Sequence, residues 1–112
     1  MRFLCLYKPS RPEGTPLSDQ EMAGMNALIK DMRASGVLLA TEGCMPSALG
    51  ARVRLSNGTF SVTGGPFPES KELVEGYALI QANSRAEAIE HTMRFLRAAG
   101  EGESEIRQVW EP

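Results

Sequence analysis

Three charged residues, Glu69, Lys71 and Glu72, follow a Gly-Gly-Pro-Phe turn in the sequence VTGGPFPESKELVEGY of residues 62–77. Glycine permits backbone angles that other residues avoid, and Pro66 fixes the exit from the turn. Charged groups held beside such a turn could bind an anionic or polar group of a ligand. They could also form an ion pair that locks the loop, which is the interpretation that we favour. The segment predicts a candidate cleft but does not specify a reaction.

Glu42 is the candidate for acid–base catalysis. It lies at the end of an expected strand in the sequence TEGC, where its carboxylate could project into a cleft and exchange a proton. It could equally accept backbone hydrogen bonds in the following turn. Tyr7, at the end of the first strand, could point its hydroxyl into the cleft, and Phe67 could offer a stacking surface. Packing is the more common role for both aromatic residues.

Histidine and metal chemistry are disfavoured. His91, the single histidine, lies beside Glu90 in the sequence IEHTMRF, which favours a solvated helix position over a catalytic base. Cys5 and Cys44 lack the spacing of metal ligands and are interpreted as reduced, buried thiols. We therefore expect no transition-metal site and no cofactor.

Size and charge restrict the classes of function. The 112 residues, 42% hydrophobic, fit one domain over residues 1–112. Twelve basic and fourteen acidic residues give a net charge of −2 and are interleaved, so direct nucleic-acid binding is disfavoured. The chain opens on an alternating strand instead of a signal peptide, and no apolar run could span a membrane. We expect a soluble, cytoplasmic protein.

The hydrophobic pattern predicts the elements that must position these residues. Ser18 with Glu21 predicts a capping box that opens a helix through residue 34, and Ser84 with Glu87 predicts another that opens a helix closing at Gly100. The Ser-Asn-Gly sequence of residues 56–58 is typical of a hairpin turn. Strands are expected at residues 2–7, 37–41, 51–55, 59–63, 76–82 and 106–110.

Each expected helix has an apolar stripe that should pack on the sheet. The stripes consist of Met22, Met25, Ile29 and Met32 in the first helix, and of Ala88, Ile89, Thr92, Met93, Phe95 and Leu96 in the second. The element order predicts an α+β fold, with a ferredoxin-like antiparallel sheet, two helices on one face and an inserted β-hairpin. Because the strands are apolar on both sides, the opposite face needs a cover, and a second copy is the economical solution.

The segment GGPFPESKE resembles the DGPF signature of the YCII-related family, small α+β proteins of mostly unassigned function. The segments MRFLCLY, SGVLLATEGCMP and EIRQVWEP are similar to the same family, so the resemblance covers nearly the whole chain. Glu42 matches a recurring acidic position in the family's GEG segment. The resemblance implies a dimeric α+β barrel, in which two sheets pack face to face and enclose a cleft.

The family motif begins with an aspartate where this chain has Gly64, and the loss of that carboxylate weighs against catalysis. The resemblance supports a homodimer that binds a small polar ligand in a cleft at the dimer sheet face, where acid–base chemistry could follow. Glu42 is the catalytic candidate. The predicted ligand contacts are Tyr7, Phe67, Glu69, Lys71 and Glu72.

The alternative is a non-catalytic accessory or regulatory module. Family members are often associated with extracytoplasmic-function sigma factors, so the resemblance suggests a transcription-linked protein partner. An enzyme should bury Glu42 or Lys71 in a pocket and shift its pKa, whereas an interaction module should leave both exposed in ion pairs. Whether the protein is an enzyme stays open at this point.

Overall fold

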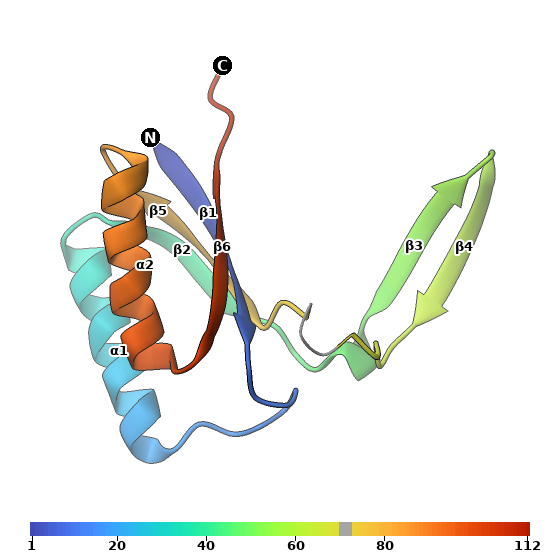
Figure 1. The fold of residues 1–112 in the computed structure, drawn as a ribbon, viewed down its shortest axis with the longest axis horizontal. Helices are drawn as coiled ribbons and strands as arrows, with labels where there is room; N and C mark the ends of the chain where they lie inside the picture. The colour runs from blue at the N-terminus through green and yellow to red at the C-terminus, as the bar shows by residue number, and fades with distance from the viewer. Residues whose placement is uncertain (70–72) are drawn as a thin grey trace.

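The computed structural model describes residues 1–69 and 73–112 as an α+β fold (Figure 1). Its elements are β1 (Arg2–Pro9), α1 (Asp19–Ala34), β2 (Leu38–Gly43), the 3-10 turn η1 (Ser47–Leu49), β3 (Ala51–Ser56), β4 (Thr59–Gly64), β5 (Gly76–Gln81), α2 (Arg85–Ala99) and β6 (Gly102–Gln108). Two of the predicted site residues, Lys71 and Glu72, lie outside the described residues.

The main sheet has four antiparallel strands in the order β2-β5-β1-β6, and β3 pairs with β4 in a separate two-stranded sheet. Both helices cover one face of the main sheet (Figure 1). This is the ferredoxin-like arrangement with an inserted hairpin that the element order predicts. The central places of β1 and β5 are also as predicted, because both strands are apolar enough to be surrounded.

Both helices begin at the predicted serine caps. The Ser18 hydroxyl accepts a hydrogen bond from the Glu21 backbone N–H at 3.1 Å, and the Ser18 N–H donates to Glu21 Oε1 at 3.0 Å, which completes a capping box. The Ser84 hydroxyl accepts from the Glu87 backbone N–H at 3.1 Å. Within the described residues, neither helix combines the length and the apolar character that a membrane span needs.

The core lies between the helices and the sheet, where Phe3, Leu28 and Ile80 are buried. The predicted helix stripes are only partly correct, since Met22 is 51% exposed and Met93 is 45% exposed. In α1 the buried line is set instead by Leu28 and Met32, one turn apart. Met22 precedes Leu28 by six residues, which places it about 120° around the helix from the buried line.

Two strands extend differently from the prediction. β2 continues to Gly43, so Glu42 is part of the strand. β6 begins at Gly102, earlier than residue 106, because its backbone pairs with β1 from Pro9↔Gly102 onward even though its first residues are polar. Trp110, which we expected in that strand, lies beyond it and is 84% exposed.

The hairpin of β3 and β4 turns at Asn57 and Gly58, whose φ angles are 52° and 76°. Positive φ at both central residues is the geometry that a tight two-residue hairpin requires, so the predicted turn is confirmed. The hairpin projects away from the main sheet on the side opposite the helices (Figure 1). Every residue of its two strands is exposed.

Candidate functional site

A cavity of about 230 Å³ lies between the two helices and the main sheet. Side chains of α1, α2 and the sheet form its mainly apolar wall, with Met25, Ile29, Phe95, Cys5 and Ile80 among them. Pockets for drug-sized ligands are usually roughly 300–1,000 Å³. This cavity is smaller, and its size suits a ligand with about one ring.

Four buried polar atoms on this wall have no hydrogen-bond partner within residues 1–69 and 73–112: Arg11 Nε, Glu75 Oε2, His91 Nε2 and Ser104 Oγ. A buried polar atom without a partner costs about 1–3 kcal/mol, so native proteins rarely leave one unpaired. A guanidinium donates, a carboxylate accepts, and a hydroxyl can do either. The wall therefore offers both donors and acceptors to a small molecule.

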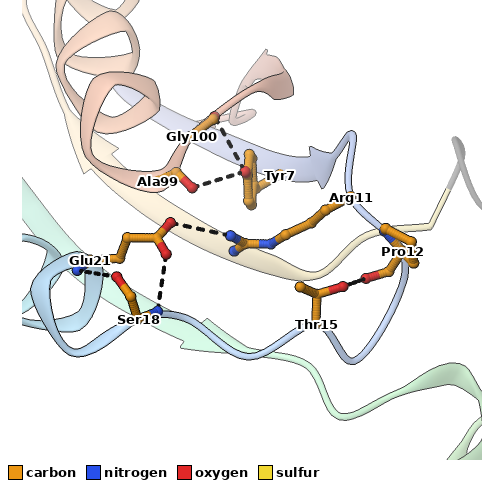
Figure 2. Close-up of polar contacts among 8 residues, drawn as sticks. All are labelled: Tyr7, Arg11, Pro12, Thr15, Ser18, Glu21, Ala99 and Gly100. Atoms are coloured by element: carbon orange, nitrogen blue, oxygen red, sulfur yellow. Dashed lines mark hydrogen bonds and ion pairs between the residues drawn. The ribbon is translucent and has the colours of Figure 1, made fainter.

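Tyr7 also lines the cavity, and Figure 2 shows its hydroxyl beside the end of α2. Its hydroxyl donates to the carbonyl oxygens of Ala99 at 3.5 Å and Gly100 at 3.4 Å, both long for hydrogen bonds of a hydroxyl. Burial raises the pKa of Tyr7; the nearby Arg11 opposes this rise, while Glu75 adds to it. The phenol therefore stays protonated near neutral pH and can donate a stronger hydrogen bond to another acceptor.

Arg11 reaches the cavity from the loop that joins β1 to α1. Thr15 closes a turn in this loop through a hydrogen bond from its Oγ1 to the Pro12 carbonyl at 2.6 Å. Arg11 Nη1 lies 3.6 Å from Glu21 Oε2, a loose ion pair that Figure 2 shows. Glu21 is itself fixed by the capping box, where hydrogen bonds from Ser18 lower the pKa of Glu21. The start of α1 thus orients the guanidinium and leaves Nε unpaired.

His91 is half-buried and lines the cavity. The interpretation of His91 as a solvated helix residue is therefore wrong, because α2 presents it toward the space beside α1. Glu87 Oε1 lies 3.4 Å from His91 Nε2, one turn away on α2, without the geometry of a hydrogen bond. The imidazole adds a polar group to the wall.

Glu42 and Tyr7 do not share a sheet face. Glu42 pairs with Tyr77 and Tyr7 pairs with Gly76, and consecutive residues of a strand point to opposite faces. Glu42 is exposed and borders the cavity at the end of β2, whereas Tyr7 is buried under the helices. The two side chains are not brought together in one cleft at the helix-free face.

Phe67 and Glu69 lie beside the hairpin, away from the cavity lining. The Arg52 guanidinium carbon lies 3.9 Å from the centroid of the Phe67 ring, and Arg52 Nη1 lies 3.0 Å from Glu69 Oε2. Hydrogen bonds from its own backbone and from Arg52 lower the pKa of Glu69. The ion pair between Arg52 and Glu69 joins the segment after the Gly-Gly-Pro-Phe turn to β3, and both of its side chains are exposed to solvent.

The Gly-Gly-Pro-Phe turn packs against η1. The Phe67 N–H donates to Ser47 Oγ at 3.0 Å, and Ser47 Oγ donates to Glu13 Oε2 at 2.8 Å. A Cβ atom on Gly65 would lie only 1.7 Å from the Ser47 carbonyl oxygen. Close backbone packing therefore requires glycine at this position.

The sequence prediction missed Arg11, Glu75 and Ser104. Glu75 immediately precedes Gly76 at the start of β5, so it is a strand-end carboxylate of the kind that drew attention to Glu42. Arg11 and Ser104 give no comparable local signal. Among the described residues, no three His, Cys, Asp or Glu side chains gather in a way that could hold a metal ion.

The cysteines differ in environment. Cys5 is buried, as expected of a small apolar residue, and burial raises the pKa of its thiol. Cys44 is exposed, so the same expectation is wrong there. Both are free thiols.

Both a protein-family model and a solved structure match nearly the whole chain. The family model described as YCII-related domain matches residues 1–111. No curated protein matches the sequence. A solved structure of 5-chloro-2-hydroxyhydroquinone dehydrochlorinase (TftG) from Burkholderia phenoliruptrix, in complex with 2,5-dihydroxybenzoquinone, is similar with a TM-score of 0.57 and 17% identity over 99% of this chain and 94% of that chain. A likeness at this identity shows the fold.

Proposed function

Because the chain belongs to the YCII-related family, whose model matches residues 1–111, we propose that it forms a single domain and binds a small molecule in the cavity between the helices and the sheet. The observation that carries this proposal is the set of four buried polar atoms on the cavity wall that have no hydrogen-bond partner among the described residues. The similar TftG structure holds 2,5-dihydroxybenzoquinone, a single-ring compound with hydroxyl and carbonyl groups. A ligand of that size and polarity suits the cavity described above.

The polar groups of the wall define how such a ligand would be held. Arg11 Nε would donate to a carbonyl or an anionic oxygen, and Glu75 Oε2 would accept from a hydroxyl. The protonated Tyr7 phenol would donate to a second oxygen. The apolar wall would cover the ring and exclude water, which strengthens these hydrogen bonds.

Acid–base chemistry is the finer part of the proposal. A carboxylate at Glu75 could take a proton from a bound hydroxyl while the Tyr7 phenol stabilises the negative charge that develops elsewhere on the ring. Glu42, at the border of the cavity, stays the candidate that the sequence predicted. Its exposure fits proton exchange with solvent better than a role inside the cavity.

Binding can be tested directly by calorimetry with 2,5-dihydroxybenzoquinone and with catechol as probes. We expect saturable binding of one molecule per chain, which Glu75→Gln and Arg11→Met both weaken by about ten-fold or more. Glu90→Gln is the matched control, because Glu90 is exposed on α2 and does not line the cavity. Equal effects of Glu75→Gln and Glu90→Gln would contradict a ligand site in this cavity.

We also propose a cytoplasmic homodimer. The two free cysteines are in keeping with a reducing compartment. The sheet face opposite the helices has apolar residues that a second copy would cover, Leu4, Leu6 and Leu79 among them. No finding supports the sigma-factor-linked partner that the family resemblance suggested, and we do not propose it.

A further inference from the structure

One face of the β3–β4 hairpin is apolar. The register pairs Val53 with Val62 and Leu55 with Phe60, and residues paired across two strands lie on the same face. These four side chains, the hairpin apolar face, are each 61–70% exposed. The opposite face carries Arg54 and other polar residues. One apolar and one polar face are typical of a sheet whose apolar face is covered by other protein and whose polar face is in contact with water.

The hairpin is anchored at its base and uncovered along its length. The Gly65 N–H donates to the Gly50 carbonyl at 3.1 Å, and Arg52 contacts Glu69 and Phe67 where the hairpin meets the rest of the chain. Beyond this base all residues of both strands are exposed. Two-stranded hairpins without a packing partner are marginally stable in water, so this one needs a cover.

The main sheet has a second uncovered apolar surface. Leu4 pairs with Leu79 and Leu6 pairs with Tyr77, which places the four side chains on the face opposite the helices. Figure 1 shows the hairpin standing on that same side of the sheet, directed away from it. In the part of the chain that the structure describes, neither surface covers the other.

We propose that the hairpin is an arm that packs its apolar face on a second copy of this chain, in a two-fold exchange that accompanies contact between the two helix-free sheet faces. This inference rests on the proposed homodimer and adds the element that joins its subunits. Each chain has both apolar surfaces, the hairpin apolar face and the helix-free sheet face. A two-fold contact between two chains would cover the four apolar surfaces of the pair together. A different partner protein would have to cover both surfaces without this symmetry.

The area that the hairpin apolar face can bury is consistent with a second copy of this chain as the partner. Four side chains exposed to this extent bury on the order of 400 Å² when covered, about half of the roughly 800 Å² per subunit that a stable interface needs. The hairpin apolar face alone therefore does not reach that area, and a stable dimer also needs contact through the helix-free sheet face.

Sedimentation equilibrium tests the role of the arm. We expect the natural chain to be dimeric, and the double variant Leu55→Ser/Phe60→Ser to dissociate at least about ten-fold more readily. The control is Arg54→Ser/Thr63→Ser, which changes the same two strands on the opposite face. Both variants change exposed residues, and circular dichroism checks that both remain folded.

The outcomes separate this inference from the proposed homodimer. A monomer at concentrations of about 100 µM would overturn both. A dimer that both double variants weaken equally, or that neither weakens, would overturn the arm and leave the dimer standing. Neither result would affect ligand binding in the cavity, which the calorimetric test measures separately.

Photo-crosslinking locates the contact. Phe60 is replaced by p-benzoylphenylalanine in a mixture of ¹⁴N-labelled and ¹⁵N-labelled chains, and crosslinked peptides are analysed by mass spectrometry. We expect crosslinked pairs that combine the two isotopes, because the arm contacts the other chain. Crosslinks found only between peptides of the same isotope would show an intrachain contact and would overturn the inference.

Discussion

The ring of Tyr7 meets the ring of Phe95 edge-on, with centroids 5.2 Å apart and planes inclined at 85°. This contact between β1 and α2 fixes the direction of the phenol, which lines the cavity. Edge-to-face pairs contribute about 0.5–1.5 kcal/mol beyond their burial, so the orientation is well supported. The hydroxyl is thus held near two carbonyl oxygens without a short hydrogen bond to either.

Tyr7→Phe should change the pH dependence of stability more than stability itself. Below about pH 10, the pKa of an unfolded tyrosine, we expect a loss of no more than about 1 kcal/mol, because the hydrogen bonds are long. Burial raises the pKa of Tyr7 in the folded state, so above pH 10 the unfolded chain loses its phenol proton first and stability falls. The variant lacks this group and should lose stability less steeply. Urea unfolding at pH 8 and pH 11 gives the loss of unfolding free energy between these two pH values for the natural chain and for the variant. Equal losses in the two proteins would contradict the raised pKa of Tyr7.

Glu42→Gln and Glu75→Gln should have different effects on ligand binding. Glu75 has a buried, unpaired carboxylate oxygen on the cavity wall, whereas Glu42 is exposed at its border. We expect Glu42→Gln to change the affinity for 2,5-dihydroxybenzoquinone less than about three-fold, well below the effect of Glu75→Gln. Calorimetry at one pH compares the two. The reverse order would move the site to the helix-free face of the sheet.

Gly65→Ala should disrupt the turn that Gly64→Ala tolerates. A Cβ on Gly65 would meet the Ser47 carbonyl oxygen at 1.7 Å, whereas a Cβ on Gly64 has no neighbour within 4 Å. We expect Gly65→Ala to cost about 2 kcal/mol or more and Gly64→Ala less than about 1 kcal/mol. Thermal or urea unfolding measures the difference. Similar losses in the two variants would mean that η1 does not pack against the turn as described.

Alkylation should distinguish the two cysteines of the folded protein. Cys44 is exposed, while Cys5 is buried and burial raises the pKa of its thiol. Since the thiolate is the reactive form, we expect iodoacetamide at pH 8 to modify Cys44 first and Cys5 only after unfolding. Peptide mass spectrometry gives the order. Equal labelling rates in the native protein would show that the space between helices and sheet opens readily.

Arg52→Gln should raise the pKa of Glu69. Two hydrogen bonds lower this pKa, the larger effect coming from the backbone of Glu69 and the smaller from Arg52. Removing Arg52 should therefore reverse part of the lowering and raise the pKa of Glu69 toward its ordinary value. Arg54→Gln is the control on the same strand, because Arg54 lies on the same face two residues farther along the hairpin, whereas the ion pair with Glu69 is made by Arg52. An NMR titration of the Glu69 carboxyl carbon measures the change, and an identical titration in both variants would exclude the ion pair in solution.

Local pattern was sufficient to predict most of the fold. The serine caps, the Asn57-Gly58 turn and the apolar character of β1 and β5 depend on residues close together in the chain, so they could be recognised without the structure. The start of β6 could not, because its polar first residues become a strand only by pairing with β1. The prediction that Met22 packs on the sheet was wrong for a related reason, since helical periodicity does not say which of several apolar lines faces the sheet.

By itself, the sequence determined the type, order and approximate bounds of the elements, because capping, turn geometry and side-chain periodicity are local. Only the tertiary structure decided which polar residues meet. Arg11, Glu75 and Ser104 come from a loop, a strand start and an edge strand, and only the strand order places them on one cavity wall. The register shift between Leu38 and Ala40 likewise sets the face of Glu42, because a shift of one residue exchanges the two faces of a strand.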